Sequence, residues 1–313
     1  MTKNAPAGVS IQRNSMLRRY MRRHWVLYAM LLLPVLYYII VKYVPMVGNV
    51  LAFRRYRPGM SPFGTEWTMR YFERFLRDPM FWRAFRNTLV ISVFNILVNF
   101  PIPIIFAILL NEVRIKPFQK FVQTVSYVPR FVSTVVVIAI LNELLSPSSG
   151  LVNRLLESLG MEVIYFMNEP EWFRPVYILS ETWQFTGWTA IIYLAAITSI
   201  SPDLFEAAEI DGAGRLQRIW YVTVPCILPT IAVMLIINVG HMLRLGFEKV
   251  LLMYTPANSS VSDIIDTLVY RTGLQSQNYS YATAVGLFSG LIGLVLVISA
   301  NTASKKLTGE SIY

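Results

Sequence analysis

Six apolar segments, each about 20 residues long, constrain the fold of this chain more than any other feature. A helix of roughly 20 apolar residues is long enough to cross the ~30 Å hydrocarbon core of a bilayer. The sequence therefore predicts an all-α polytopic membrane protein with six transmembrane helices. The predicted spans are Trp25–Val47, Thr88–Leu110, Phe121–Leu145, Val176–Ile197, Ile227–Phe247 and Tyr281–Thr302.

The composition supports the membrane class. Of 313 residues, 55% are hydrophobic and 15% are charged, whereas soluble domains carry about 25% charged residues. The net charge of +10 would suggest nucleic acid in a soluble chain, but here it fits basic loops beside an anionic bilayer. We therefore expect membrane lipid and no nucleic acid as a partner. One cysteine and two histidines exclude an intrachain disulfide and a cysteine-rich or histidine-rich metal site.

The distribution of positive charge predicts the topology. Arginines precede the first span directly, and Lys305 and Lys306 flank the last, so both termini are expected in the cytoplasm. The first external loop opposes the positive-inside rule, since its eight arginines and three acids give a net +5. The expected organisation is a cytoplasmic tail (1–24), the first transmembrane helix (25–47), an external basic loop (48–86), a core of five helices (87–301) with a cytoplasmic loop at 199–225, and a cytoplasmic tail (302–313).

The most informative segment is the cytoplasmic loop between the fourth and fifth spans. Ser201, followed by a proline and acidic residues, is typical of a helix start. Gly212 and Gly214 are expected to end this helix and to allow a left-handed turn, and a second short helix, about Arg215 to Val222, is expected to run to Pro225. The residues leave two interpretations open: an ordinary amphipathic connector, or a compact surface on which a partner docks.

One spacing within the loop is specific. Glu206-Ala207-Ala208, three residues, Gly212, nine residues, Val222, one residue and Val224-Pro225 resemble the EAA signature of ABC importer permeases, E-A-A-x3-G-x9-I-x-L-P. The chain departs from that signature only by valine for isoleucine and valine for leucine. Further segments are similar to the sugar-permease branch, and to its LplB-type subgroup, relatives of the maltose and glycerol-3-phosphate permeases. These segments are Trp188–Ala196, Gly246–Tyr254 and Tyr279–Gly286.

The resemblance implies the fold and the partners. It implies a type I ABC importer permease fold in the bacterial cytoplasmic (inner) membrane, with 87–301 as its transmembrane core. The loop would be a coupling helix that docks into a cleft on a separate ATPase subunit. The implied coupling residues are Glu206, Ala207, Ala208, Gly212 and Pro225.

The resemblance further implies an assembly of a second, usually different, permease subunit, two ATPase subunits and an extracytoplasmic solute-binding protein, with an oligosaccharide as cargo. The chain itself has no G-x-x-x-x-G-K-[ST] phosphate loop. We therefore expect no cofactor and no catalytic residue in this chain, with ATP and magnesium bound by the ATPase subunits.

Ionisable residues within predicted spans are candidates for the substrate path, because burying charge in a bilayer is costly. Arg130 lies after a proline in the third predicted span, and Arg244 and Glu248 have the spacing of an ion pair in the fifth. Either these charges neutralise one another, or they line the path. Trp and Tyr residues there either contact sugar rings or anchor span ends at the membrane interface. The candidate path residues are Arg130, Arg244, His241, Gln184, Trp188 and Tyr193.

The cargo stays open between several polar solutes. The basic external loop and the intramembrane arginines favour an acidic, uronate-containing oligosaccharide, but a neutral oligosaccharide or a sugar phosphate remains an alternative. An ion-coupled secondary transporter would commonly show inverted repeats, and we find no repeat in the sequence. A membrane enzyme is disfavoured, because the sequence shows no triad, metal or paired-carboxylate spacing.

Overall fold

The computed structural model describes residues 20–61, 66–243 and 245–308. These ranges form helices joined by loops, and the β-type pairing within them is an isolated antiparallel bridge between Arg54 and Trp67. The predicted all-α class is confirmed. The helices are α2 (Trp25–Tyr38), α3 (Val44–Met46), α4 (Arg70–Leu76), α5 (Pro79–Asn99), α6 (Pro101–Asn111), α7 (Lys116–Tyr127), α8 (Thr134–Leu144), α9 (Leu151–Ser158), α10 (Pro170–Thr198), α11 (Pro202–Ile210), α12 (Arg215–Arg218), α13 (Val224–Gly240), α14 (Phe247–Met253), α15 (Ser259–Ser262), α16 (Ile265–Tyr270) and α17 (Tyr279–Thr308).

Four helical runs are long and apolar enough to cross a membrane, and they correspond to the first, second, fifth and sixth predicted spans. Each of the other two predicted spans belongs to a bent pair of helices. The described residues therefore provide four candidate spans, or six if each bent pair is one span. The runs are Trp25–Phe53, Pro79–Asn111, Arg215–Gly240 and Tyr279–Lys306, and the bent pairs are Lys116–Phe131 with Thr134–Leu144 and Pro170–Thr198 with Pro202–Ile210.

The third predicted span, Phe121–Leu145, is not one continuous helix. The chain bends by 101° between Phe131 and Thr134. Val132 is extended, and the Ser133 hydroxyl caps the next helix by accepting a hydrogen bond from the Val136 N–H at 3.4 Å. A new helix with its own cap begins here, which averaged hydropathy does not reveal.

The fifth predicted span, Ile227–Phe247, extends too far. Helix α13 ends at Gly240, and the His241 N–H closes its last turn by donating to the Ile237 carbonyl at 3.1 Å. A new short helix, α14, starts only at Phe247. The residues between these helices include Arg244, which lies outside the described residues together with any pairing of its side chain.

Helix α10 packs against α5, α6, α7 and α13, and it contributes to two of the apolar clusters of the core through Tyr177 and Tyr193. Its contact with α7 is close, because a Cβ added at Gly187 would lie only 2.2 Å from the Ser126 carbonyl oxygen. Small residues at such crossings let helix backbones approach within a membrane.

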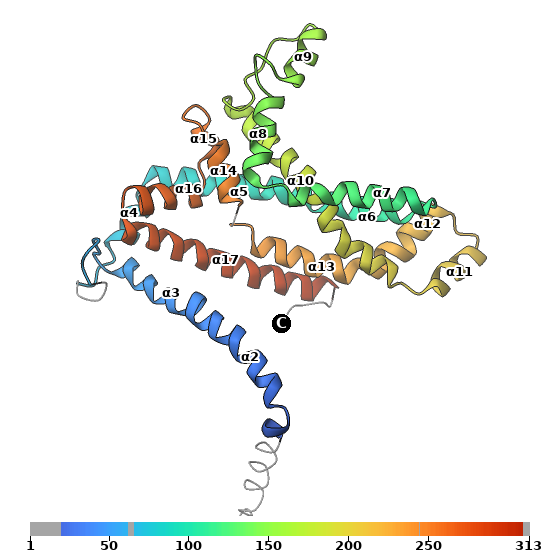
Figure 1. Cartoon of the computed structure of the whole chain (residues 1–313), viewed down its shortest axis with the longest axis horizontal. Helices are drawn as coiled ribbons and strands as arrows, with labels where there is room; N and C mark the ends of the chain where they lie inside the picture. The colour runs from blue at the N-terminus through green and yellow to red at the C-terminus, as the bar shows by residue number, and fades with distance from the viewer. Residues whose placement is uncertain (1–19, 62–65, 244, 309–313) are drawn as a thin grey trace, which may run out of the picture.

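The long axis of the molecule separates two ends with different features. The α11–α12 loop lies at one end, and α4 with the start of α17 lies at the other (Figure 1). Helices α8 and α9 project from the body, and α2 diverges from it (Figure 1). The apolar window of the first span is wholly unburied within the described chain, so its surface is available to lipid or to another subunit.

Candidate functional site

The loop between the fourth and fifth spans forms the predicted helix and turn. The Ser201 hydroxyl caps α11 by accepting a hydrogen bond from the Asp203 N–H at 3.3 Å. Beyond α11, Gly212 has a φ of +79°, in the left-handed region that glycine adopts at low cost. The Ala213 N–H then donates to the Ala208 carbonyl at 2.8 Å and closes the turn. The predicted helix and the left-handed turn at Gly212 are confirmed, whereas Gly214 has a φ of −69° and takes no part in a left-handed turn.

The predicted end of the second short helix, about Arg215 to Val222, is wrong. The helical run continues from Arg215 to Gly240, with a π-helical turn over Ile219–Thr223. Pro225 lies in the first turn of α13, where the missing proline N–H costs least. The helical run therefore passes through Pro225 from the loop into the fifth span.

The face presented by α11 is largely open. Every residue of this helix is exposed or half-buried, and Ile210 is 87% exposed. Glu206 and Ala207 are exposed, and Ala208 is half-buried. Within the described part of the chain, the Glu206 carboxylate forms neither a hydrogen bond nor an ion pair. The arrangement supplies a surface with two small residues and the unengaged carboxylate of Glu206 for a partner.

Two ion pairs hold this loop in place. Arg218 Nη1 lies 3.1 Å from Glu209 Oε2, which joins α12 to α11. Arg215 Nε lies 3.5 Å from Glu112 Oε2, which joins the loop to the end of α6. Exposed pairs of this kind contribute about 0–1 kcal/mol each, so they orient the loop more than they stabilise the fold.

A buried charged pair joins α14 and α10. Lys249 Nζ lies 2.6 Å from Glu181 Oε1, and the lysine side chain is only 3% exposed. The ammonium also donates to Gln184 Oε1 at 3.2 Å, and Gln184 Nε2 donates to the Val132 carbonyl at 3.1 Å. This network joins α14 and α10 to the break between α7 and α8.

Lys249 was not among the site residues predicted from the sequence. The available signal was a single lysine within the apolar segment Phe247–Met253, since a lysine there needs a partner. The fourth predicted span begins at Val176, which would place Glu181 in its first turns, but α10 begins at Pro170 and places Glu181 well inside the helix. At this position the Glu181 carboxylate meets the Lys249 ammonium group.

The candidate path residues fall into separate environments. Gln184 is 3% exposed and bonded within the Lys249 network. Arg130 is exposed at the break after α7, with its guanidinium 5.0 Å from the Phe185 ring centre. Trp188 is 45% exposed, and its ring meets Phe131 edge-on. His241 is exposed just beyond α13. The candidates do not form one continuous lining.

Tyr193 lines a polar cavity of about 210 Å³ between α5, α10 and α13. Its hydroxyl is buried without a hydrogen-bond partner among the described residues. The other polar groups of this cavity are amides, a hydroxyl and a carboxylate, which can bond the hydroxyls of a sugar. They belong to Asn95, Asn99, Asn238, Thr189 and Glu181.

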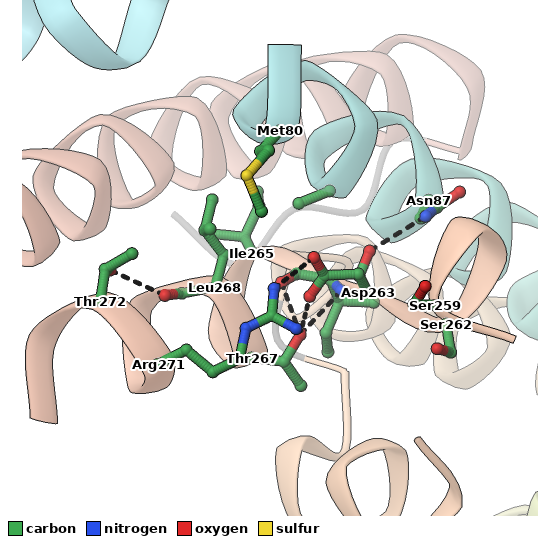
Figure 2. Close-up of polar contacts among 12 residues, drawn as sticks. Met80, Asn87, Ser259, Ser262, Asp263, Ile265, Thr267, Leu268, Arg271 and Thr272 are labelled. Atoms are coloured by element: carbon green, nitrogen blue, oxygen red, sulfur yellow. Dashed lines mark hydrogen bonds and ion pairs between the residues drawn. The ribbon is translucent and has the colours of Figure 1, made fainter. Parts of the chain in front are cut away.

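A second buried network involves Arg174, near the start of α10. Figure 2 shows the Asp263 carboxylate between Arg271 and Thr267, with its backbone carbonyl toward Asn87. Arg271 Nη2 lies 2.5 Å from Asp263 Oδ2, and the Asn87 amide donates to the Asp263 carbonyl at 3.0 Å. Arg174 of α10 in turn donates to Asn87 Oδ1 at 3.3 Å. These bonds fix α16 to α5 and α10.

Comparison with known proteins places this geometry among transport proteins. The family described as "Binding-protein-dependent transport system inner membrane component" matches residues 99–308. The polygalacturonan/rhamnogalacturonan transport system permease protein YteP of Bacillus subtilis (strain 168) is 47% identical over 288 residues, covering 92% of this chain and 90% of that protein. Protein LplB of the same organism is 41% identical over 312 residues, covering 99% and 98% of the two chains.

A solved structure agrees with these relatives. A chain in the crystal structure of a bacterial ABC transporter involved in the import of the acidic polysaccharide alginate superimposes with a TM-score of 0.86. That chain is 43% identical to this one, and the match covers 94% of this chain and 99% of the other. A second crystal structure holds the alginate transporter in complex with an alginate pentasaccharide-bound periplasmic protein.

Proposed function

Because the chain belongs to the family of binding-protein-dependent transport system inner membrane components, we propose that it passes an acidic oligosaccharide through the bacterial inner membrane as one half of an ATP-driven importer's permease. Members of this family are transport subunits, so the chain is a permease rather than an enzyme. One observation carries the proposal: the fold of an alginate importer subunit extends over 94% of this chain.

The acidic cargo rests on the relatives and on charge. YteP belongs to a polygalacturonan/rhamnogalacturonan transport system, and the solved transporter takes part in the import of the acidic polysaccharide alginate. In this chain, eight arginines occupy 48–86, and Arg130 is exposed at the α7–α8 break. A positive field at the entrance raises the local concentration of an anionic cargo.

Coupling to ATP would pass through α11. Its open face, with Glu206, Ala207 and Ala208, fits a cleft on an ATPase subunit, and Gly212 sets the turn behind it. The loop follows α10 through a 68° bend and continues without interruption into Arg215–Gly240. A displacement of α11 would therefore move α10 and α13 together, and both helices line the Tyr193 cavity.

The path itself would follow polar groups on α10 and its neighbours. Tyr193 and the cavity amides offer hydrogen bonds to sugar hydroxyls, and Trp188 and Arg130 lie beside the α7–α8 break. Gln184 would act by holding Lys249 rather than by contacting cargo. His241 and Arg244 follow α13 and would meet cargo only if the path extends along that segment.

The complete machine would contain a second, different permease subunit, two ATPase subunits that bind ATP and magnesium, and an extracytoplasmic solute-binding protein. Docking of α11 to an ATPase would place that end of the molecule in the cytoplasm. An even number of spans would then leave both termini on the cytoplasmic side. The α4 end, which lies opposite the α11 loop along the long axis in Figure 1, would face outward.

A cargo comparison in proteoliposomes tests the proposal. The complete complex is reconstituted with its binding protein and ATP, and uptake of galacturonate trimer is compared with uptake of a neutral trisaccharide and a sugar phosphate. We expect the uronate trimer to be imported and to compete with labelled cargo. Import of the neutral trimer or the sugar phosphate at an equal rate would contradict an acidic oligosaccharide as the cargo.

A further inference from the structure

A large basic pocket is lined in part by α4. Helix α4 lies at the end of the molecule opposite the α11 loop (Figure 1). We call this basic pocket the outer pocket; its volume is about 980 Å³. It forms where the segment after the first span and α4 meet the turn 276–278 that precedes α17. Ligand-binding pockets measure about 300–1,000 Å³, so this one is large enough for more than one sugar ring.

Backbone contacts hold the wall of the outer pocket. The Thr68 N–H donates to the Phe53 carbonyl at 2.9 Å beside the Arg54–Trp67 bridge. Ser280 fastens this wall to α17, since its hydroxyl donates to the Arg54 carbonyl at 2.7 Å and accepts from the Tyr56 N–H at 3.1 Å. These hydrogen bonds fix the backbone of the described part of the pocket wall.

The charge of the outer pocket is strongly positive. Arg55, Arg57, Arg70 and Arg74 line it and are exposed, against the single acid Glu66 among the described lining residues. The four guanidinium groups form no ion pair with described residues. Arginine presents a planar fork of donors that matches a carboxylate in two bonds. The pocket therefore offers several guanidinium groups that can bind a carboxylate.

The remaining lining suits a sugar better than an acidic protein surface. Trp67 is 67% exposed, and Tyr56 and Tyr71 also face the pocket, so aromatic surface lies among the arginines. Gln277 and Asn278 add amide donors and acceptors from the opposite turn. A uronate ring carries a carboxylate, an apolar ring face and hydroxyls together. An acidic protein rim would use only the arginines.

We infer that the outer pocket binds uronate residues of the oligosaccharide on the external side, before the cargo enters the membrane path. This inference rests on the proposed function and adds a site to it. The pocket holds one part of a charged chain close to the entrance while the rest is still held by the solute-binding protein.

The test measures direct binding in the absence of the solute-binding protein. Equilibrium dialysis of labelled galacturonate trimer is carried out with the detergent-solubilised complex of permease and ATPase subunits. In the variant Arg57→Gln/Arg70→Gln we expect binding about tenfold weaker, which corresponds to roughly 1.4 kcal/mol. The matched control is Arg77→Gln/Arg83→Gln, which removes the same charge from exposed residues of the same region that do not line the pocket.

A variant that should retain binding tests whether misfolding, rather than lost charge, explains weaker binding of the trimer. Glu66→Gln removes the acid from the lining, and we expect it to bind the trimer at least as tightly as wild type. Assembly of every variant is checked by size-exclusion chromatography. A neutral trisaccharide of equal length should show no arginine-dependent binding.

Three results would overturn the inference. Equal weakening by the pocket and control variants would mean that general charge attracts the trimer. Unchanged trimer binding with weaker docking of the solute-binding protein would assign the arginines to that protein. Tight binding of the neutral trimer would remove the role of the carboxylate. Failure of the proposed function is distinguishable, because the wild-type complex would then not import the uronate trimer with its binding protein present.

Discussion

Lys249 Nζ and Glu181 Oε1 lie 2.6 Å apart, although 68 residues separate them along the chain. The contact joins α14 to α10, and through Gln184 it reaches the carbonyl of Val132 at the break before α8. Three segments, α14, α10 and the break before α8, are therefore connected through one ammonium group. Removing a single member of this network should disturb stability and transport together.

The first prediction concerns this pair. Breaking a buried ion pair by removing one partner costs about 3–5 kcal/mol, and we expect the lower end here because Glu181 is 19% exposed. Lys249→Met and Glu181→Gln should each lower the thermal stability of the purified complex. The double variant should lose less than the sum of the two, as measured by a thermal-shift double-mutant cycle. Additive losses would show that the residues act separately.

The second prediction concerns the turn behind α11. Gly212→Val places a β-branched residue at φ +79°, a conformation that costs non-glycine residues about 1–2 kcal/mol or more. We expect the complex to insert but uptake to fall at least tenfold relative to ATP hydrolysis. Gly214→Ala is the matched control, because Gly214 has a φ of −69° and an added Cβ there meets only Gln217 at 3.6 Å. Normal coupled uptake in Gly212→Val would contradict the role of the turn.

The third prediction concerns the crossing of α7 and α10. Gly187→Ala would bring a Cβ to 2.2 Å from the Ser126 carbonyl oxygen, so the two backbones must separate. Overpacking of this kind costs about 1–3 kcal/mol or more, and we expect a lower thermal transition and less assembled complex. Gly290→Ala in α17 meets open space and should leave both unchanged. Equal behaviour of the two variants would show that α7 and α10 are less closely packed.

The fourth prediction concerns Arg130. Its exposed guanidinium at the α7–α8 break should favour anionic cargo, so Arg130→Gln should raise the KM for galacturonate trimer several-fold. Arg154→Gln changes an exposed arginine on α9 and serves as the control. Initial uptake rates in proteoliposomes measure both. An unchanged KM in Arg130→Gln would remove this residue from the path.

Local sequence signals predicted local structure well. The start of α11 at Ser201 and the left-handed Gly212 followed from the preferences of a few adjacent residues. The break at Val132 was not predicted, because hydropathy averaged over about 20 residues treats two short apolar helices as one span.

Contacts between distant segments were beyond such signals. Glu181 and Lys249 are 68 residues apart in the sequence, and only the packing of α14 on α10 pairs them. The arginines of 48–86 were recognised as a positive loop, but their pocket exists only because the turn 276–278 lies beside them in the fold.

The central claim is that ATP, through a docked ATPase, drives import by this permease. The most direct measurement is the accumulation of galacturonate trimer in proteoliposomes that contain the complete complex, with ionophores collapsing every ion gradient. We predict that accumulation continues with ATP and stops when a non-hydrolysable analogue replaces ATP. Accumulation that ionophores abolish, or that occurs without the ATPase subunits, would contradict the account.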